Sequence, residues 1–111
     1  MNIYFVEHIN NDENNRKELL FVNYDYFDGN DLIVKILQEK YDIKVGDKFD
    51  GIWYSIIPLY YKEQEYKLMW HEDVGNYIYS EQQDQESIDI MRELIIVAMN
   101  EINKRIAKSR A

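Results

Sequence analysis

Cysteine is absent from this chain of 111 residues, so the chain has neither a disulfide framework nor a thiolate metal site. A chain without cysteine fits a reducing compartment such as the cytoplasm. Proline occurs once and glycine four times, and no glycine-rich loop of the kind that cradles phosphate is present. No apolar run approaches the roughly 18 residues that span a bilayer, and the first residues lack the basic stretch of a signal peptide. We therefore expect a soluble, cytoplasmic protein.

Catalytic motifs are missing as well. There is no G-x-S-x-G sequence, and none of the four serines has a base beside it in the sequence: Ser55, Ser80, Ser87 and Ser109. Nothing singles out a pair for glycoside chemistry among the 21 acidic residues. Basic patches interleaved with aromatic residues, which are typical of nucleic-acid binding, do not occur. The sequence therefore predicts a protein with no catalytic residues, no cofactor and no bound metal.

Acidic residues outnumber basic residues by 21 to 13, which gives a net charge of −8. Residues 1–80 hold fifteen acidic and eight basic residues, whereas residues 81–111 hold six and five. An acidic surface repels nucleic acid and anionic membranes and attracts basic partners. The same charge also keeps a protein soluble without any partner. We expect neither nucleic acid nor a membrane among the binding partners.

The longest apolar pattern at helical spacing runs from about Gln82 to Ile106. Its first stripe consists of residues three or four apart: Ile88, Met91, Ile95, Met99, Ile102 and Ile106. A second stripe lies beside the first: Ile90, Leu94 and Val97. Two neighbouring stripes make a wide apolar sector, which favours packing against a sheet over the narrow seam of a coiled coil. The pattern therefore predicts a long C-terminal helix on a sheet, with a dimer helix as the alternative.

The preceding part of the chain carries mostly strand signals. Five segments rich in β-branched and aromatic residues predict strands: residues 1–9, 18–26, 52–61, 66–71 and 77–80. Helical spacing from Leu32 to Tyr41 predicts one short helix. Residues 43–51 form a connection with a strand-like start. Pro58 cannot donate a backbone hydrogen bond, so it marks an edge, a bulge or a strand end.

The predicted order is β-β-α-β-β-β-α, in a single domain covering residues 1–111. Hairpin connections dominate this order, so we expect an α+β fold with a mostly antiparallel, twisted sheet. The long C-terminal helix and the shorter helix would pack on one face of that sheet. The other face would be solvated and rich in tyrosine and charge.

His71, Glu72 and Asp73 form the sharpest local cluster, because a histidine beside carboxylates can bind a metal or act as a general base. Consecutive residues of a strand point to opposite faces, so the three cannot converge on one ion. A site there needs further ligands, for which Glu7 and His8 are the candidates. We interpret the cluster as a solvated strand end. A small metal-dependent or acid–base enzyme that uses His71 and nearby carboxylates is the alternative.

Tyrosine is frequent, with ten in the chain, and most lie in or beside predicted strands. Exposed tyrosine next to acidic residues suits a binding surface, although ordinary sheet packing explains the same residues. Together with the acidity and the missing catalytic motifs, this predicts a small acidic interaction protein that inhibits a basic partner by direct binding. Immunity proteins and antitoxins act in this way, and a nuclease-like toxin is one such partner.

Seven residues on neighbouring predicted hairpins are the candidate contacts for that partner: Tyr60, Tyr61, Glu63, Glu65, Glu72, Asp73 and Tyr77. They combine aromatic surface with carboxylates in the acidic part of the chain. A homodimeric accessory domain, joined through the long helix or an exposed strand, is a further alternative.

Overall fold

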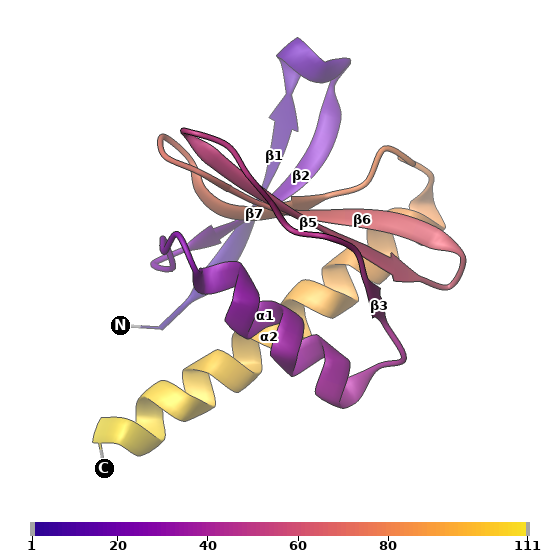
Figure 1. Cartoon of the computed structure of the whole chain (residues 1–111). Helices are drawn as coiled ribbons and strands as arrows, with labels where there is room; N and C mark the ends of the chain where they lie inside the picture. The colour runs from indigo at the N-terminus through magenta and orange to yellow at the C-terminus, as the bar shows by residue number, and fades with distance from the viewer. Residues whose placement is uncertain (1, 111) are drawn as a thin grey trace.

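In a computed structural model that describes residues 2–110, seven strands form one antiparallel sheet and two helices lie against one of its faces (Figure 1). The strands are β1 (Tyr4–Asn10), β2 (Arg16–Val22), β3 (Lys44–Val45), β4 (Phe49–Asp50), β5 (Tyr54–Tyr61), β6 (Gln64–His71) and β7 (Gly75–Tyr79). The helices are α1 (Gly29–Lys40) and α2 (Gln85–Arg110), and a single 3-10 turn, η1 (Asn11–Glu13), joins β1 to β2. The strand order across the sheet is β1-β2-β7-β6-β5-β3, and β4 also pairs with β5. The predicted α+β class and the order of strands and helices are confirmed, and β3 and β4 are short additions within residues 43–51.

The first hairpin is regular along its whole length. β1 and β2 pair over seven residues each, without an interruption. In the connection, the side chain of Asn10 accepts a hydrogen bond from the N–H of Asp12 (3.2 Å). Asn14 and Asn15 take φ angles of 56° and 59°, a region that asparagine enters more readily than most residues. The asparagine-rich stretch is therefore the turn that brings β1 to one edge of the sheet.

The opposite edge of the sheet is interrupted beside Pro58. β3 pairs with the end of β5 that follows Pro58, and β4 pairs with the part that precedes it. The N–H of Gly46 donates to the carbonyl of Pro58 (2.9 Å), so the backbone of Pro58 faces this edge. Since proline has no N–H to donate in return, the edge strand cannot continue unbroken. A Cβ atom on Gly46 would lie 2.6 Å from Cγ of Pro58, so the close approach requires glycine.

The main core lies between the sheet and the two helices. α2 contributes Met91, Leu94, Ile95 and Ile102 from the two predicted stripes, all fully or almost fully buried, together with buried Ala98. α1 adds Ile33, Ile36 and Leu37, and the sheet adds Leu19, Leu59, Leu68 and Ile78. α2 is capped by Asp84, whose carboxylate accepts hydrogen bonds from the backbone N–H (3.3 Å) and the hydroxyl (2.6 Å) of Ser87. The predicted packing of a wide apolar sector against a sheet is confirmed.

The other face of the sheet carries no helix, and we call it the open face. Its residues form rows across the strands. The strand register aligns one apolar row: Val6, Leu20, Tyr77, Met69, Ile56 and Phe49. Tyr77 and Tyr79 in the middle of this face are buried. The guanidinium of Arg16 lies 3.5 Å from the centre of the Tyr79 ring and covers it. The expected face is rich in tyrosine and charge, but the expectation that it is solvated is wrong at its centre, where Tyr77 and Tyr79 are buried and Tyr79 packs beneath Arg16.

Neither helix in the described part of the chain is long and apolar enough to cross a membrane.

Candidate protein-binding surface

Three connections meet at one end of the sheet, where Figure 1 shows the β4–β5 and β6–β7 turns side by side. We call this region the loop end and define it by residues 25–31, 48–53 and 72–74. The two turns are joined by a hydrogen bond from the N–H of Glu72 to the carbonyl of Trp53 (2.9 Å). The indole N–H of Trp70 on β6 donates to Asp25 in the β2–α1 connection (2.9 Å). Segments far apart in the sequence therefore build one surface.

A buried amide ties the β2–α1 connection to the sheet. Asn76 on β7 is fully buried, and its side chain accepts from the N–H of Tyr26 (2.8 Å) and donates to the carbonyl of Tyr26 (3.1 Å). It also donates to the side chain of Asn30 at the start of α1 (3.0 Å). The hydroxyl of Tyr24 donates to the carbonyl of Gly29 (2.6 Å), and burial raises the pKa of Tyr24 to about 12. The connection is thus held in one conformation by groups without access to water.

Replacing Asn76 with Ala should lower the free energy of unfolding by about 1–3 kcal/mol, because the Tyr26 backbone and the Asn30 amide lose their buried partner. Urea denaturation followed by circular dichroism measures this change. Asn100→Ala on the exposed side of α2 is the matched control. Equal effects of the two substitutions would show that the Asn76 network does not hold the loop end.

Six large apolar side chains of the loop end are exposed: Tyr26, Phe27, Phe49, Ile52, Trp53 and Val74. Ile52 and Trp53 form the tip of the β4–β5 turn and are 84% and 59% exposed. The turn is closed by a hydrogen bond from the N–H of Gly51 to the carbonyl of Tyr54 (2.8 Å). The edge of the Phe27 ring packs on Trp70, with 5.2 Å between ring centres. A rigid turn that holds an isoleucine and a tryptophan in water is typical of a protein interface.

Carboxylates surround this apolar group. Six are exposed at the loop end: Asp25, Asp28, Asp31, Asp50, Glu72 and Asp73. Lys48 is the basic residue among them, and its ammonium group lies 3.2 Å from Asp31 and 3.9 Å from Asp50. Among the side chains that the structure describes, no ion pair involves Asp25, Asp28, Glu72 or Asp73. The loop end is therefore strongly negative.

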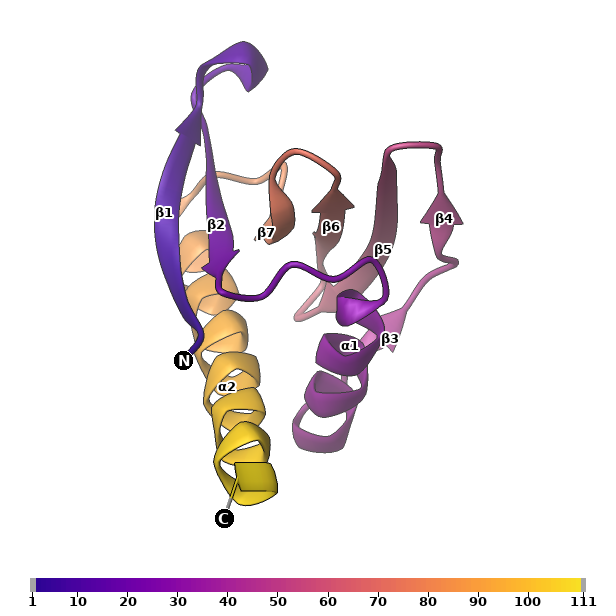
Figure 2. The same cartoon turned by 90° about the vertical axis from the view of Figure 1, so that its left-hand side faces the viewer.

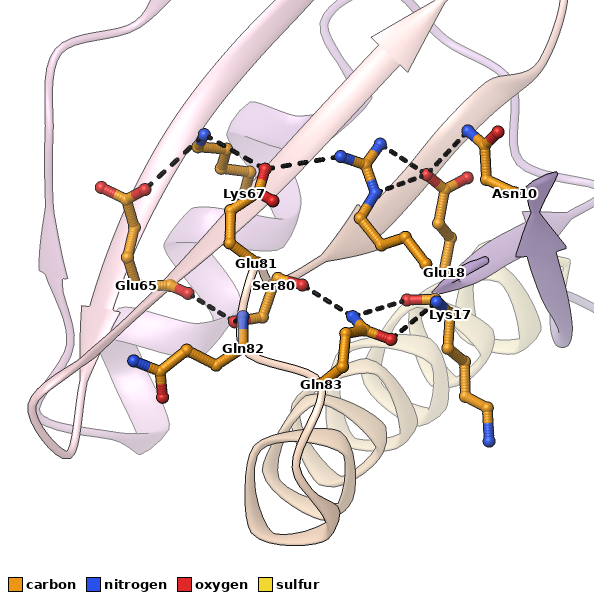
Figure 3. Close-up of polar contacts among 10 residues, drawn as sticks. Asn10, Lys17, Glu18, Glu65, Lys67, Ser80, Glu81, Gln82 and Gln83 are labelled. Atoms are coloured by element: carbon orange, nitrogen blue, oxygen red, sulfur yellow. Dashed lines mark hydrogen bonds and ion pairs between the residues drawn. The ribbon is translucent and has the colours of Figure 1, made fainter. Parts of the chain in front are cut away.

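Three acidic residues at the opposite end of the sheet are paired with basic side chains (Figure 3). Arg16 lies 2.7 Å from the buried carboxylate of Glu18 and 3.4 Å from Glu81. Lys67 lies 3.8 Å from Glu65 and 3.9 Å from Glu81. Glu18, Glu65 and Glu81 therefore each have a basic partner, unlike Asp25, Asp28, Glu72 and Asp73 at the loop end.

A shallow depression of about 250 Å³ lies at the loop end between Trp53, His71, Glu72 and Asp73. Nδ1 of His71 accepts a hydrogen bond from the N–H of Asp73 (3.0 Å), which leaves Nε2 free to meet a ligand. His8 lies on β1, three strands away from β6, so it is not a neighbour of His71. Glu7 is bound to Arg92 of α2. Neither residue can complete a metal site at His71, and within residues 2–110 no group of three or more metal-ligating side chains is close enough to hold an ion.

Four of the seven candidate contacts lie at the end of the sheet away from the loop end. Tyr60 and Glu65 face each other across β5 and β6, and a hydrogen bond to Glu65 raises the pKa of Tyr60. Glu63 is exposed in the β5–β6 turn. Tyr61 packs on Tyr41, with 5.4 Å between ring centres, and belongs to the helix side of the sheet. These residues form a separate, partly neutralised surface.

The other three candidates are divided between the loop end and the sheet centre. Glu72 and Asp73 are exposed in the β6–β7 turn and belong to the loop end. Tyr77 lies in the centre of the open face, 8% exposed, and burial raises its pKa to about 12. The seven residues therefore do not form one continuous patch; of their four carboxylates, Glu63, Glu72 and Asp73 are exposed and free of ion pairs among the described side chains, and of these three only Glu72 and Asp73 lie at the loop end.

Sequence reasoning missed Ile52, Trp53 and Phe27 as surface residues. The β-strand composition of residues 52–61 predicts a strand that includes Ile52 and Trp53. In the structure β5 begins two residues later, at Tyr54. The available signal was Asp50-Gly51, a dipeptide that favours a hairpin turn.

No protein-family model, curated protein or solved structure matches this chain.

Proposed function

We propose that this protein is a small acidic interaction protein that binds a basic protein partner through the loop end and thereby inhibits it, as immunity proteins and antitoxins do. One observation carries the proposal: six exposed large apolar side chains share the loop end with six exposed carboxylates and one lysine. We place this activity in the cytoplasm as part of the same proposal, because a chain without cysteine suits a reducing compartment.

The two kinds of side chain have different roles in such a complex. Exposed carboxylates without an internal partner attract a basic surface and raise the rate of association. Ile52 and Trp53 then supply the apolar anchor, since a few buried aromatic and aliphatic side chains carry most of the binding energy in protein interfaces. The hydrogen bonds of Asn76 and Trp70 hold the loops in place, which reduces the entropy lost on binding.

The enzyme alternative receives less support from the same geometry. Catalytic sites are concave and bring polar groups together from several sides. Here Glu72 and Asp73 lie in an exposed turn, and the backbone of Asp73 already occupies one nitrogen of His71. The depression suits a protruding side chain of a protein partner better than an enclosed substrate.

Two double charge reversals test the proposal. Glu72→Lys with Asp73→Lys alters the loop end, and Glu63→Lys with Glu65→Lys alters the far end of β6 by the same total charge. Tagged wild-type protein should recover a basic partner from its native cells at low salt and release it at high salt. The loop-end variant should lose this partner, whereas the far-end variant should keep it with only a small loss.

Equal losses for both variants would assign the attraction to net charge and not to the loop end. Unchanged binding and salt dependence in both would remove the charge argument altogether. Circular dichroism of each variant shows whether the fold is retained, because all four positions are exposed and should tolerate lysine.

A further inference from the structure

β1 is an unprotected edge of the sheet. It pairs with β2 on one side, and in the described part of the chain no strand lies on its other side. Its seven residues contain no proline, glycine or lysine, and its pairing with β2 has no bulge. Natural edge strands normally carry such features because a bare edge adds another strand. The opposite edge is protected, since β3 and β4 have two residues each and are separated beside Pro58.

Exposed apolar side chains flank this edge on both faces of the sheet. Tyr4 and Val6 on the open face are 51% and 42% exposed, and Ile9 on the helix face is 45% exposed. α2 runs along the β1–β2 hairpin (Figure 2), with Arg92 bound to Glu7 and Asn103 bonded to the backbone of Ile3. Ile96, one turn after Arg92, is the exposed apolar residue on that side of α2.

The charge at this edge differs from that at the loop end. Glu7 is the single acidic residue of β1, and it is paired with Arg92 and, at 3.8 Å, with Lys17. A chain with a net charge of −8 repels its own copies wherever its acidic residues are free. A second copy can approach the neutral β1 edge, whereas the loop end excludes it. A basic partner, conversely, gains nothing from electrostatics at β1.

The sequence of β1 is compatible with pairing to itself. Opposite residues of an antiparallel pair share one face of the sheet, so a two-fold axis places one residue against its own counterpart. An axis at Val6 sets Val6 against Val6, Tyr4 against His8, and Phe5 against Glu7. An axis at Glu7 would set two carboxylates directly opposite each other, which is destabilising. The axis at Val6 also joins the apolar rows of the two open faces.

We propose that the protein forms a two-fold symmetric homodimer in which β1 of each copy pairs antiparallel with β1 of the other, centred on Val6. The two sheets then continue as one, and Ile96 of each copy lies beside the new strand pair on the helix face. The loop ends remain free at a distance from the axis, so this dimer is independent of the function proposed for them.

Light scattering after size exclusion tests the dimer over a wide range of protein concentration. Wild-type protein should have twice the chain mass of 13.5 kDa. Val6→Lys should have the single chain mass, because it sets two ammonium groups against each other at the axis. Tyr60→Lys is the matched control, since Tyr60 is a strand residue of nearly equal exposure, 43% against 42%, and should keep the double mass.

A disulfide provides a second test that does not depend on disrupting the strand. The chain has no cysteine, so Val6→Cys introduces one thiol per copy. At the axis the two Cα atoms approach to about 4.5–5.5 Å, which a disulfide spans. Val6→Cys should form a cross-linked dimer on mild oxidation. His8→Cys should not, because its counterpart lies about 13 Å along the strand.

Three results would each overturn the proposal: a single chain mass for the wild type at every concentration, a double mass for Val6→Lys, or cross-linking of Val6→Cys no faster than that of His8→Cys. The first would show that the β1 edge stays bare in solution. The second would assign the dimer to another surface, and the third would exclude the register centred on Val6.

Discussion

Replacing Trp53 with Ala should weaken binding of a basic partner by roughly 2–4 kcal/mol, about thirty- to a thousand-fold in Kd. Trp53 is 59% exposed at the tip of the β4–β5 turn, so its indole has apolar surface that only a partner can bury. Its backbone carbonyl, which accepts the N–H of Glu72, is retained in the variant. The fold should therefore be unchanged while affinity falls. Calorimetric titration with the partner recovered by the wild type measures the effect.

Tyr60→Ala is the control for this substitution. Tyr60 is also an exposed aromatic residue, but it lies at the far end of β5 opposite Glu65, which is paired with Lys67. Its removal should change the binding free energy by less than about 1 kcal/mol, as expected for residues outside a hot spot. A larger loss for Tyr60→Ala than for Trp53→Ala would move the interface to the β5–β6 turn, where four of the original candidate contacts lie.

The helices and hairpins could be predicted because their signals are local. The two stripes of α2 repeat every three or four residues, and each strand of the first hairpin is bounded by a polar turn. The sequence does not predict β3 and β4 as two strands, because two residues are too few to show an alternating apolar pattern. Their positions depend on the Gly46–Pro58 contact, which joins residues distant in the sequence.

The loop end could not be predicted in the same way. It is assembled by contacts such as Trp70 with Asp25, which are 45 residues apart, and no pattern within one segment encodes them. The sequence predicts tyrosine on the open face, but it could not show that Tyr77 and Tyr79 are buried there. Arg16 covers the ring of Tyr79 from a different strand, and Tyr77 packs in one cluster with Met69 and Tyr79. Tertiary contacts of this kind decide which exposed-looking residues a partner can reach.

Replacing Leu94 with Ala should lower the free energy of unfolding by roughly 2–5 kcal/mol, the range for removing a fully buried leucine. Leu94 is 0% exposed and belongs to the second apolar stripe of α2, where the helix meets Ile33 and Leu37 of α1 and Leu68 of β6. The substitution leaves a cavity lined by both helices and by β2, β6 and β7, and no single element can close it by moving alone. Urea denaturation measures the change, with Glu93→Ala on the exposed side of α2 as the control at about 0.5 kcal/mol or less. Affinity of the folded fraction for a partner should stay the same, because the hydrogen bonds of Asn76 and Trp70 that hold the loop end are retained in the variant. A loss of stability as small as that of the control would mean that the second stripe is not part of the core.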